Sequence, residues 1–415
     1  MPSVLKVRLS ILLFFEFFVW GAWYTTIAVY MSNNGMENLT HWPFTGNAIA
    51  AIVAPFIVGM IADRYFNTEK ILGTLHLLGG VILLFTPGLS SNPTLFILFL
   101  ILYNICYMPT MSLANSLCFH HINNQEKEFP VIRTFGTIGW IIAGLVISFV
   151  LVSFVSEGIT PEQTALPIYM AGSFSLLLGI YCLTLPKTPP QGKGQETTWR
   201  GILGVDALKK LWSRSFFIFL LSSFLICIPL AVYYNFTQVY MQDAGFKNIA
   251  ATQTIGQMSE AFFMVIMPFL FVRLGVKWML AVGMFAWVLR YGLFAVAAPD
   301  AITWMILMGI ALHGICYDFF FVTGQIYVDK KADPSIKGQA QGLIIFVTYG
   351  VGMLVGTQIA GKIFNFYLED ANRLTLEMWK SFWIIPAVFA LGVLLFFVVS
   401  FNDKKVDKKI QKEVL

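Results

Sequence analysis

Long runs of hydrophobic residues alternate with short polar breaks along the whole chain. Each run is about as long as the 20 residues that a helix needs to cross a bilayer. The pattern predicts an all-α membrane protein with twelve transmembrane helices. The expected spans are 8–31, 44–62, 70–88, 94–118, 130–155, 165–186, 215–241, 250–272, 277–297, 301–327, 338–366 and 378–401.

The longest break, 187–214, is rich in Pro, Gly and polar residues, which is typical of a linker. It separates two sets of six spans. We therefore expect an N-terminal six-helix bundle over 1–186, this linker, a C-terminal six-helix bundle over 215–401 and a tail over 402–415. The plan resembles that of major facilitator transporters, whose halves are related by a pseudo-two-fold axis.

Composition narrows the class of protein. The chain is 57% hydrophobic and 12% charged, about half the charge of an average soluble domain. This excludes a soluble enzyme, a disordered protein and a nucleic-acid binder, whatever the net charge of +5. None of the five cysteines lies in a Cys-x-x-Cys or Cys/His cluster, so we expect neither disulfides nor a metal. We expect no cofactor, a lipid environment and a monomer.

Lys and Arg residues predict the orientation in the membrane. Of the 27, we assign 21 to the N-terminus, the even-numbered loops and the C-terminal tail, and three to the opposite side. Positive residues accumulate on the cytoplasmic side of membrane proteins. We therefore expect an integral protein of the plasma membrane, the bacterial inner membrane, with both termini in the cytoplasm.

A short motif follows the second span. Gly59, Asp63 and Arg64 match the G-x-x-x-D-R signature of major facilitator transporters. Its position after span two of twelve makes the match more specific than the short motif alone. A glycine there permits close helix approach, and the Asp and Arg can bridge neighbouring helix ends.

Six ionisable residues lie inside the expected spans. Each costs about 2.5–3.5 kcal/mol near the bilayer centre, so these groups must pair, line a wet cavity or lie at an interface. Intramembrane charge is a functional candidate by default. The six are Glu16, Arg133, Glu260, Arg290, Asp318 and Lys362.

Two faces in the first half combine charge with aromatic rings. Glu16, Trp20 and Trp23 are spaced i, i+4, i+7 on span one, which suits a flat ligand with polar edges. They could equally form an interfacial aromatic belt around one satisfied acid. Arg133 begins the same spacing on span five, where its guanidinium could donate forked hydrogen bonds or simply anchor the helix end. Thr137 and Trp140 complete that face.

The second half contributes two lone acids. Gln257 and Glu260 are i, i+3 on span eight, and Asp318 lies among aromatic residues on span ten. A carboxyl group in apolar surroundings favours its neutral form and can bind and release a proton. Fixed ion pairs with Arg290 or Lys362 are the alternative, and these two bases are otherwise expected to be structural. Proton-coupling candidates are therefore Asp318, Glu260 and, third, Glu16.

Seven stretches together resemble the nucleoside:proton symporter family of the major facilitator superfamily, and the likeness extends over essentially the whole chain. They are VWGAW (19–23), YMPT (107–110), FPVIRTFGTIG (129–139), QMSE (257–260), WVLR (287–290), YDFF (317–320) and QAQG (339–342). The resemblance implies proton-coupled nucleoside import by alternating access.

The resemblance also implies residue roles. Arg133 and Thr137 would hydrogen-bond the substrate, and Trp140 stands where the family can present a Phe. Gln257 and Glu260 would bind it from the second half. Asp318 would couple the proton, with Tyr317 as an aromatic contact. On span seven, Asn235 remains polar, whereas Ile228 and Ala231 stand where a Gln and an Asn are expected.

Other functions remain open from the sequence. The chain could carry another small polar solute, such as a sugar or a modified nucleoside, or it could be a transporter-like sensor that binds without turnover. An enzyme is not expected, because no nucleophile–His–acid set, metal cluster or phosphate-binding glycine loop is present in the sequence.

Overall fold

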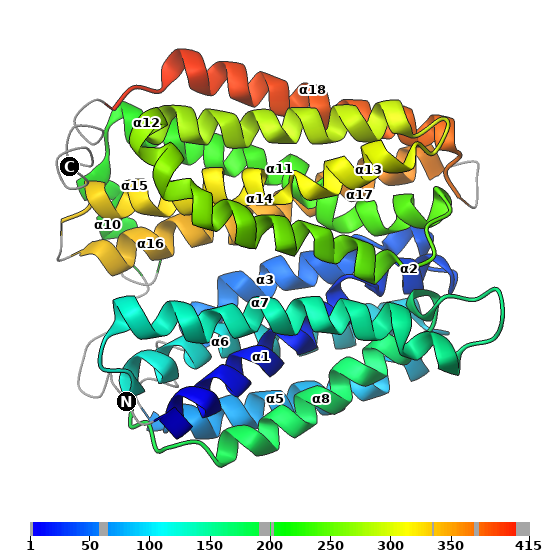
Figure 1. Ribbon diagram of the computed structural model, residues 1–415, viewed down its shortest axis with the longest axis horizontal. Coiled ribbons are helices and arrows are strands. Elements are labelled where there is room, and N and C mark those ends of the chain that lie inside the picture. Colours follow the sequence, from blue (N-terminus) through cyan, green and yellow to red (C-terminus); the bar gives the residue numbers. More distant parts are fainter. Residues whose placement is uncertain are drawn as a thin grey trace. The chain divides into compact units, whose positions relative to one another are not determined.

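The computed structural model describes residues 3–57, 65–190, 200, 203–333, 336–368 and 373–403, and these contain helices and no strand. Contacts divide the chain into two units (Figure 1). Unit 1 is Met1–Thr197 with Lys247–Thr254, and unit 2 is Thr198–Phe246 with Ile255–Leu415. Gly59, Asp63 and Arg64 lie outside the described residues.

Unit 1 contains seven described α-helices and four short 3₁₀ turns. The predicted span 8–31 is interrupted, because Thr25 and Thr26 donate their hydroxyls to the preceding turn, at the carbonyls of Gly21 and Ala22. The elements are α1 (Ser3–Tyr24), α2 (Ile27–Ser32), η1 (Glu37–Leu39), α3 (Trp42–Ile57), α5 (Thr68–Phe85), η3 (Thr86–Leu89), α6 (Pro93–His121), α7 (Gln125–Phe149), η4 (Leu151–Phe154), η5 (Pro161–Gln163) and α8 (Leu166–Leu183).

Glycines allow the helices of unit 1 to pack with their backbones in contact. Helices α1 and α7 lie side by side, as do α5 and α8 (Figure 1). A Cβ atom added at Gly139 would lie 2.1 Å from the carbonyl oxygen of Phe14. One added at Gly73 would lie 2.9 Å from that of Gly179. Small residues at such crossings are typical of membrane helices, and here they bring α1 against the polar face of α7.

Unit 2 consists of longer and more interrupted helices. Helix α12 runs through two predicted spans, with one non-helical residue, Gly275, at φ 66°. The short helix α10 lies within the predicted linker. The elements are α10 (Val205–Leu211), α11 (Arg214–Asp243), α12 (Ile249–Ala297), α13 (Thr303–Ala311), α14 (His313–Tyr317), η6 (Asp318–Val322), α15 (Thr323–Lys331), α16 (Lys337–Ile345), η8 (Phe346–Gly352), α17 (Met353–Leu368) and α18 (Leu376–Ser400).

Two of these elements, η6 and η8, are π-helical turns. Each interrupts a predicted span. Such turns are rare and occur mostly at functional sites. The first begins at Asp318 itself, so one of the candidate proton carriers lies at a point where the regular helical hydrogen bonding changes.

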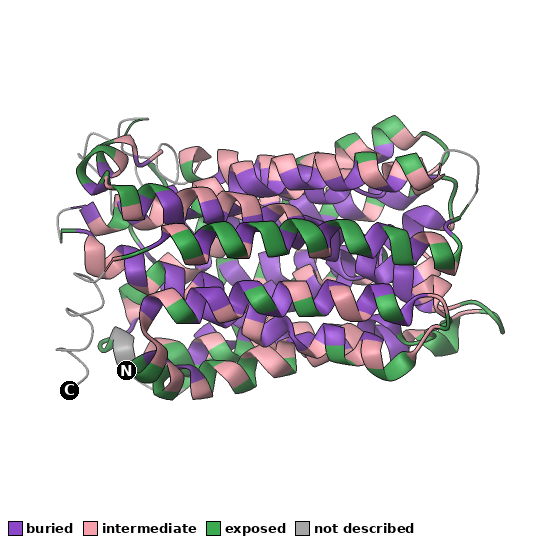
Figure 2. Cartoon of the chain, turned by 90° about the horizontal axis from the view of Figure 1, so that it is seen from above, coloured by how far each residue is buried: buried purple, intermediate pink, exposed green. Residues whose placement is uncertain are grey.

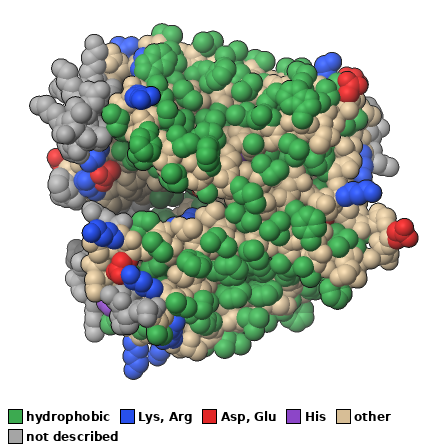
Figure 3. Space-filling model, in the orientation of Figure 1, with side chains coloured by type: hydrophobic (Ala, Val, Ile, Leu, Met, Phe, Trp, Pro, Cys, Tyr) green, Lys and Arg blue, Asp and Glu red, His purple; other side chains and the backbone are tan. Residues whose placement is uncertain are grey.

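The described helices suit a membrane. Nine of them are long and apolar enough to cross a bilayer. Helices are buried along one side and exposed along another (Figure 2). Hydrophobic side chains cover much of the visible face of each unit, and most of the visible charged groups lie toward its ends (Figure 3). An exposed apolar surface of this extent requires lipid.

A polar cluster closes one end of unit 2. The Asp403 carboxylate accepts hydrogen bonds from Ser215 at 2.9 Å and Tyr327 at 2.8 Å, and it pairs with Lys331. Burial alone would raise the pKa of Asp403, but these three donors hold its pKa below the ordinary value. The cluster joins the beginning of α11, the end of α15 and the chain just after α18. Because it contains Lys331, we call this end of unit 2 its basic end.

Candidate functional site

Helix α7 presents one polar face in unit 1. Arg133, Thr137 and Trp140 are all half-buried, so each keeps some accessible surface. The Cζ atom of Arg133 lies 4.0 Å from the centre of the Phe17 ring, a cation–π contact. A Cβ atom at Gly136 would lie 2.7 Å from the Phe17 ring and 2.9 Å from Nη1 of Arg133. Glycine at this position therefore lets Arg133 fold against α1.

An aromatic group continues the face toward Trp140. The Trp140 ring centre lies 5.2 Å from that of Trp20 and 6.1 Å from that of Tyr24. Trp20 is half-buried and also contacts Tyr107 at 6.1 Å. Unit 1 therefore brings Trp20 together with Trp140, at ring spacings that suit aromatic contacts. This pairing of spans one and five could not be read from the spacing within either span.

Glu16 and Trp23 lie elsewhere. Both are fully buried, so the structure does not place them on an accessible face with Trp20. Trp23 packs edge-on against Tyr103 at 5.5 Å. The i, i+4, i+7 spacing does align residues on a helix, but α1 is packed on α6, α7 and α8. Of these three residues, only Trp20, which contacts Trp140 of α7, keeps accessible surface.

Glu16 belongs to a buried hydrogen-bonded cluster. One carboxylate oxygen lies 2.8 Å from Nε2 of His76, and the other accepts from the Thr110 hydroxyl at 2.5 Å. Nδ1 of His76 lies 3.3 Å from the Ser175 hydroxyl. These side chains come from α1, α5, α6 and α8, and both members of the Glu16–His76 pair are buried. The geometry gives Glu16 a packing role, and sequence reasoning missed its partner because the two are 60 residues apart.

Asp318 in unit 2, unlike Glu16, has no hydrogen-bond partner among the described residues. It is fully buried, and neither carboxyl oxygen has a hydrogen-bond partner within the described part of the chain. The expected alternative, an ion pair with Arg290 or Lys362, does not occur among the described residues. A buried carboxylate without a partner is strongly disfavoured relative to the neutral acid. Within the described part of the chain, Asp318 therefore lacks the compensating group that an ionised acid would need.

Glu260 lies near both Asp318 and a histidine. Its carboxylate is close enough to interact electrostatically with Asp318. It lies 3.9 Å from Nε2 of His313, at ion-pair distance. Backbone contact positions this pair, since a Cβ atom at Gly314 would lie 2.5 Å from the Ser259 carbonyl. Gln257 is half-buried, one turn before Glu260.

His313 was not among the expected site residues. It stands between two tyrosines, with ring centres 5.6 Å from Tyr233 and 5.8 Å from Tyr317. The guanidinium of Arg290 covers the Tyr233 ring at 4.0 Å, and its Nε donates to the Gly309 carbonyl. The sequence signal that could have identified it is the position of His313 in a hydrophobic span, four residues before Tyr317. The Tyr233 ring and the Nε bond compensate part of the buried Arg290 guanidinium, whose Nη1 and Nη2 have no hydrogen-bond partner among the described residues.

The polar and apolar positions of α11 separate clearly. Asn235 is fully buried, and neither side-chain polar atom has a partner among the residues that the structure describes. Ala231, where an amide was expected by resemblance, packs against α17, and a Cβ atom at Gly356 would lie 2.9 Å from the Ala231 Cβ. The same added Cβ atom would lie 3.0 Å from the backbone Cα of Ile228. An apolar pair therefore fits this tight crossing.

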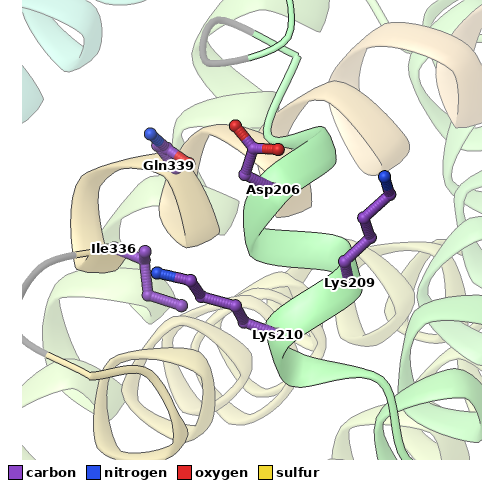
Figure 4. Close-up of a pocket in the computed structure, with 5 residues that line it drawn as sticks. All are labelled: Asp206, Lys209, Lys210, Ile336 and Gln339. Carbon is purple, nitrogen blue, oxygen red and sulfur yellow. The ribbon is translucent and has the colours of Figure 1, made fainter.

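A pocket of about 360 Å³ lies between α10 and the beginning of α16 (Figure 4). Asp206 and Gln339 lie near each other there, and Lys210 extends toward Ile336 (Figure 4). Lys209 completes the lining. Its lining contains no ring and none of the candidate residues above, so it belongs neither to the α7 face of unit 1 nor to the Asp318 region of unit 2.

Fold and sites together define a secondary transporter in the membrane. Both helical units contain buried ionisable side chains. Among the described residues, no group of side chains could bind a metal ion. Intramembrane carboxyl groups of this kind belong to proton relays in transporters. The major facilitator architecture accounts for this arrangement of long, interrupted helices in two units.

Comparison with known proteins identifies the family. The family model "Nucleoside H+ symporter" matches residues 3–406. YegT of Escherichia coli is 38% identical over 403 residues, covering 95% of this chain and 93% of that protein. Nucleoside permease NupG of Escherichia coli is 28% identical over 421 residues, covering 97% of each. The crystal structure of NupG superposes with a TM-score of 0.82 at 26% identity, covering 97% of this chain and all of that one.

The chain belongs to the nucleoside:proton symporter family. It is an integral membrane protein with the major facilitator fold, and it is a transporter that couples nucleoside uptake to protons. The prediction of fold, family and transport class from the sequence is thereby confirmed.

The Glu16–His76 pair generates a stability prediction. His76→Phe should lower the free energy of unfolding by about 1–3 kcal/mol, because it leaves one buried carboxyl oxygen of Glu16 without its hydrogen-bond partner. The double variant Glu16→Leu/His76→Phe should recover much of that loss, since both polar groups are then gone. Reversible unfolding in mixed micelles measures both. His120→Phe, at an exposed histidine, is the control. Additive effects of the two substitutions would contradict the pairing.

Proposed function

We propose that this protein imports nucleosides into the cell, and that the binding residues lie in two sets. Unit 1 contributes Arg133, Thr137, Trp140 and Trp20. Unit 2 contributes Gln257, Glu260, Tyr317 and Asn235. The observation that supports the first set is the half-buried polar face of α7, where a cation lies next to paired indoles.

The chemistry of these sets suits a nucleoside. A flat base can stack on the indoles of Trp20 and Trp140. The guanidinium of Arg133 can donate two parallel hydrogen bonds to a carbonyl edge of the base. Glu260 and Gln257 supply acceptors for hydroxyl groups of a sugar. Helix α11 has apolar Ile228 and Ala231 where the family resemblance leads us to expect two amide side chains. We therefore infer that Arg133, Gln257 and Glu260 carry most of the polar recognition.

We propose that Asp318 carries the transported proton, with Glu260 as the second candidate. The observation that carries this step is the full burial of Asp318 without a hydrogen-bond partner among the described residues. Such a carboxyl is neutral while buried and ionises when water or a cation reaches it. Glu260 interacts electrostatically with Asp318. Two negative charges so close together repel, so Glu260 and Asp318 are not expected to be ionised at the same time. If substrate binding and proton binding favour the same conformation, each strengthens the other.

We further propose that the protein lies in the bacterial inner membrane with both termini in the cytoplasm and functions as a monomer. The distribution of Lys and Arg residues supports this orientation, since 21 of 27 fall on one side of the expected spans. The basic end of unit 2, at Lys331, then faces the cytoplasm.

Arg133→Ala should weaken nucleoside binding by about 10- to 150-fold while the protein remains folded, because a hydrogen bond to a charged group contributes about 1.5–3 kcal/mol. Arg133→Lys should restore little, since the ammonium cannot donate a fork. Calorimetric titration with a panel of nucleosides measures the loss. Arg273→Ala, at an exposed arginine of α12, is the control. Unchanged affinity would place Arg133 outside the site, and an aggregated variant would favour an anchoring role.

Asp318→Asn mimics the protonated acid and should abolish accumulation of nucleoside on a proton gradient. Exchange of substrate across the membrane should persist, because exchange requires no net proton movement. Paired assays of gradient-driven uptake and counterflow in proteoliposomes measure the two. Glu260→Gln is tested in parallel. If both variants still concentrate substrate, the coupling group is another residue.

The orientation is tested by cysteine labelling. In a variant without the five native cysteines, Gln195→Cys should react with an impermeant maleimide only after the membrane is opened. Glu157→Cys, in an exposed loop of unit 1, should react in intact cells. The reverse pattern would contradict cytoplasmic termini.

A further inference from the structure

Five hydroxyl groups of unit 2 share the condition of Asp318 among the described residues, those of Ser222, Ser223, Thr237, Thr323 and Tyr349. Three of them lie on α11 and α15 near the basic end. Ser222 and Ser223 on α11 and Thr323 at the beginning of α15 are all fully buried. Within the described part of the chain, none of their hydroxyls has a hydrogen-bond partner. Buried serines and threonines in helices normally donate to their own backbone, as Thr357 does here to the Leu354 carbonyl. These three need a different explanation.

Contacts between α11 and α15 place the three hydroxyls at one level. The helices run in opposite directions, because Ser215 lies 3.5 Å from Lys331 near one end, while the Phe219 ring packs on Tyr327 at 4.8 Å. Ser222 and Ser223 are one turn beyond Phe219 along α11. Thr323 is one turn before Tyr327 on α15. Because α11 and α15 are antiparallel, moving forward along α11 and backward along α15 both lead away from the basic end. Ser222, Ser223 and Thr323 therefore lie at a similar distance from it.

The π-helical turn connects this level to Asp318. The backbone N–H of Thr323 donates to the carbonyl of Asp318, so Thr323 occupies the next turn on the same side. Tyr327 follows one α-helical turn further, and its hydroxyl donates to Asp403 at 2.8 Å. Successive polar groups are therefore separated by about one turn, or about 5.4 Å along the helix. The series Asp318, Thr323, Tyr327 and Asp403 leads from the buried acid to the basic end.

Energetics argue that these hydroxyls have partners that are not protein groups. A buried hydroxyl without a hydrogen bond costs about 1–3 kcal/mol, and three in one place would be a large fraction of the stability of a protein. Bound water satisfies such groups when each molecule finds two to four polar neighbours. Ser222, Ser223, Thr323 and the Asp318 carboxyl are the buried polar groups that this part of unit 2 offers to such water.

We propose that Asp318 exchanges its proton with the basic end of unit 2 through water molecules held by Thr323, Ser222 and Ser223, ending at the Asp403 cluster. The proton leaves the Asp318 carboxyl for the first water, an equivalent proton passes along the hydroxyls and waters, and one proton enters the aqueous phase beside Asp403. Asp318 remains as the carboxylate. This inference rests on the proposed role of Asp318 and adds the route of the proton.

The route is tested with Thr323→Val/Ser223→Ala, which removes two hydroxyls at almost constant volume. Purified protein is subjected to a rapid pH jump, and proton uptake is followed with a soluble pH indicator dye. The difference between each protein and its Asp318→Asn counterpart reports protons that reach Asp318. The double variant should slow this component at least tenfold. In proteoliposomes, its gradient-driven uptake should fall by a similar factor while counterflow stays within twofold of the unmodified protein.

Thr357→Val is the matched control, because Thr357 is equally buried in unit 2 but its hydroxyl bonds to its own helix. It should leave both measurements within twofold. If the double variant matches this control in the pH jump, or loses counterflow as fully as gradient-driven uptake, the route is wrong. Should the double variant fail to fold, Ser222→Ala and Ser223→Ala alone carry the same test.

The design separates this inference from the proposed function. If the pH-jump signal is identical in the unmodified protein and in Asp318→Asn, Asp318 does not exchange a proton and both proposals fail. If that signal exists but does not slow in the double variant, only the route fails. The pH jump requires no knowledge of the substrate, so an unidentified nucleoside does not prevent the decision.

Discussion

The cost of placing charge in a low-dielectric interior governs this structure. Every ionisable group within the membrane-spanning helices must find a compensating arrangement, and the protein uses several. Both carboxyl oxygens of Glu16 have hydrogen-bond partners inside unit 1, His76 and Thr110. Arg290 is covered by the ring of Tyr233 and bonded to a backbone carbonyl. Asp318 has neither kind of compensation among the described residues, and this difference is the basis on which we propose it as the proton carrier.

Close backbone approach makes these arrangements possible. Gly139 and Gly21 bring α1 against α7, which places Trp20 beside Trp140 and Phe17 beneath Arg133. Gly314 brings α14 against α12 and so sets His313 at ion-pair distance from Glu260. Without a hydrophobic force between helices in lipid, van der Waals contact of this kind supplies much of the association energy. Within each unit, the same glycines therefore let the helices pack closely and position their polar residues.

Irregular helices mark the functional half of unit 2. The helix that carries His313 and Asp318 breaks after Ala311 and then opens into a π-helical turn at Asp318–Val322. A second π-helical turn at Phe346–Gly352 lies beside it, and Phe321 contacts Tyr349 at 5.4 Å. Helices in transporters are interrupted where backbone or side chains serve a polar route. The irregularity thus coincides with Asp318, the acid for which the described residues supply no hydrogen-bond partner.

The sequence by itself determined the class of protein. Twelve hydrophobic runs and sparse charge predicted a helical membrane protein, because hydrophobicity and spacing act locally along the chain. The resemblance of the family stretches implied a transporter that couples nucleoside uptake to protons. Arg133, Thr137 and Trp140 were predicted to share a face for the same local reason, and they do. Which acid is compensated depends on residues far apart in the chain, so only the tertiary structure paired Glu16 with His76 and left Asp318 without a described partner. It also buried Trp23, brought Trp20 to Trp140, revealed His313 and placed the π-helical turn, because helix packing, and not periodicity, decides which side of each helix remains accessible.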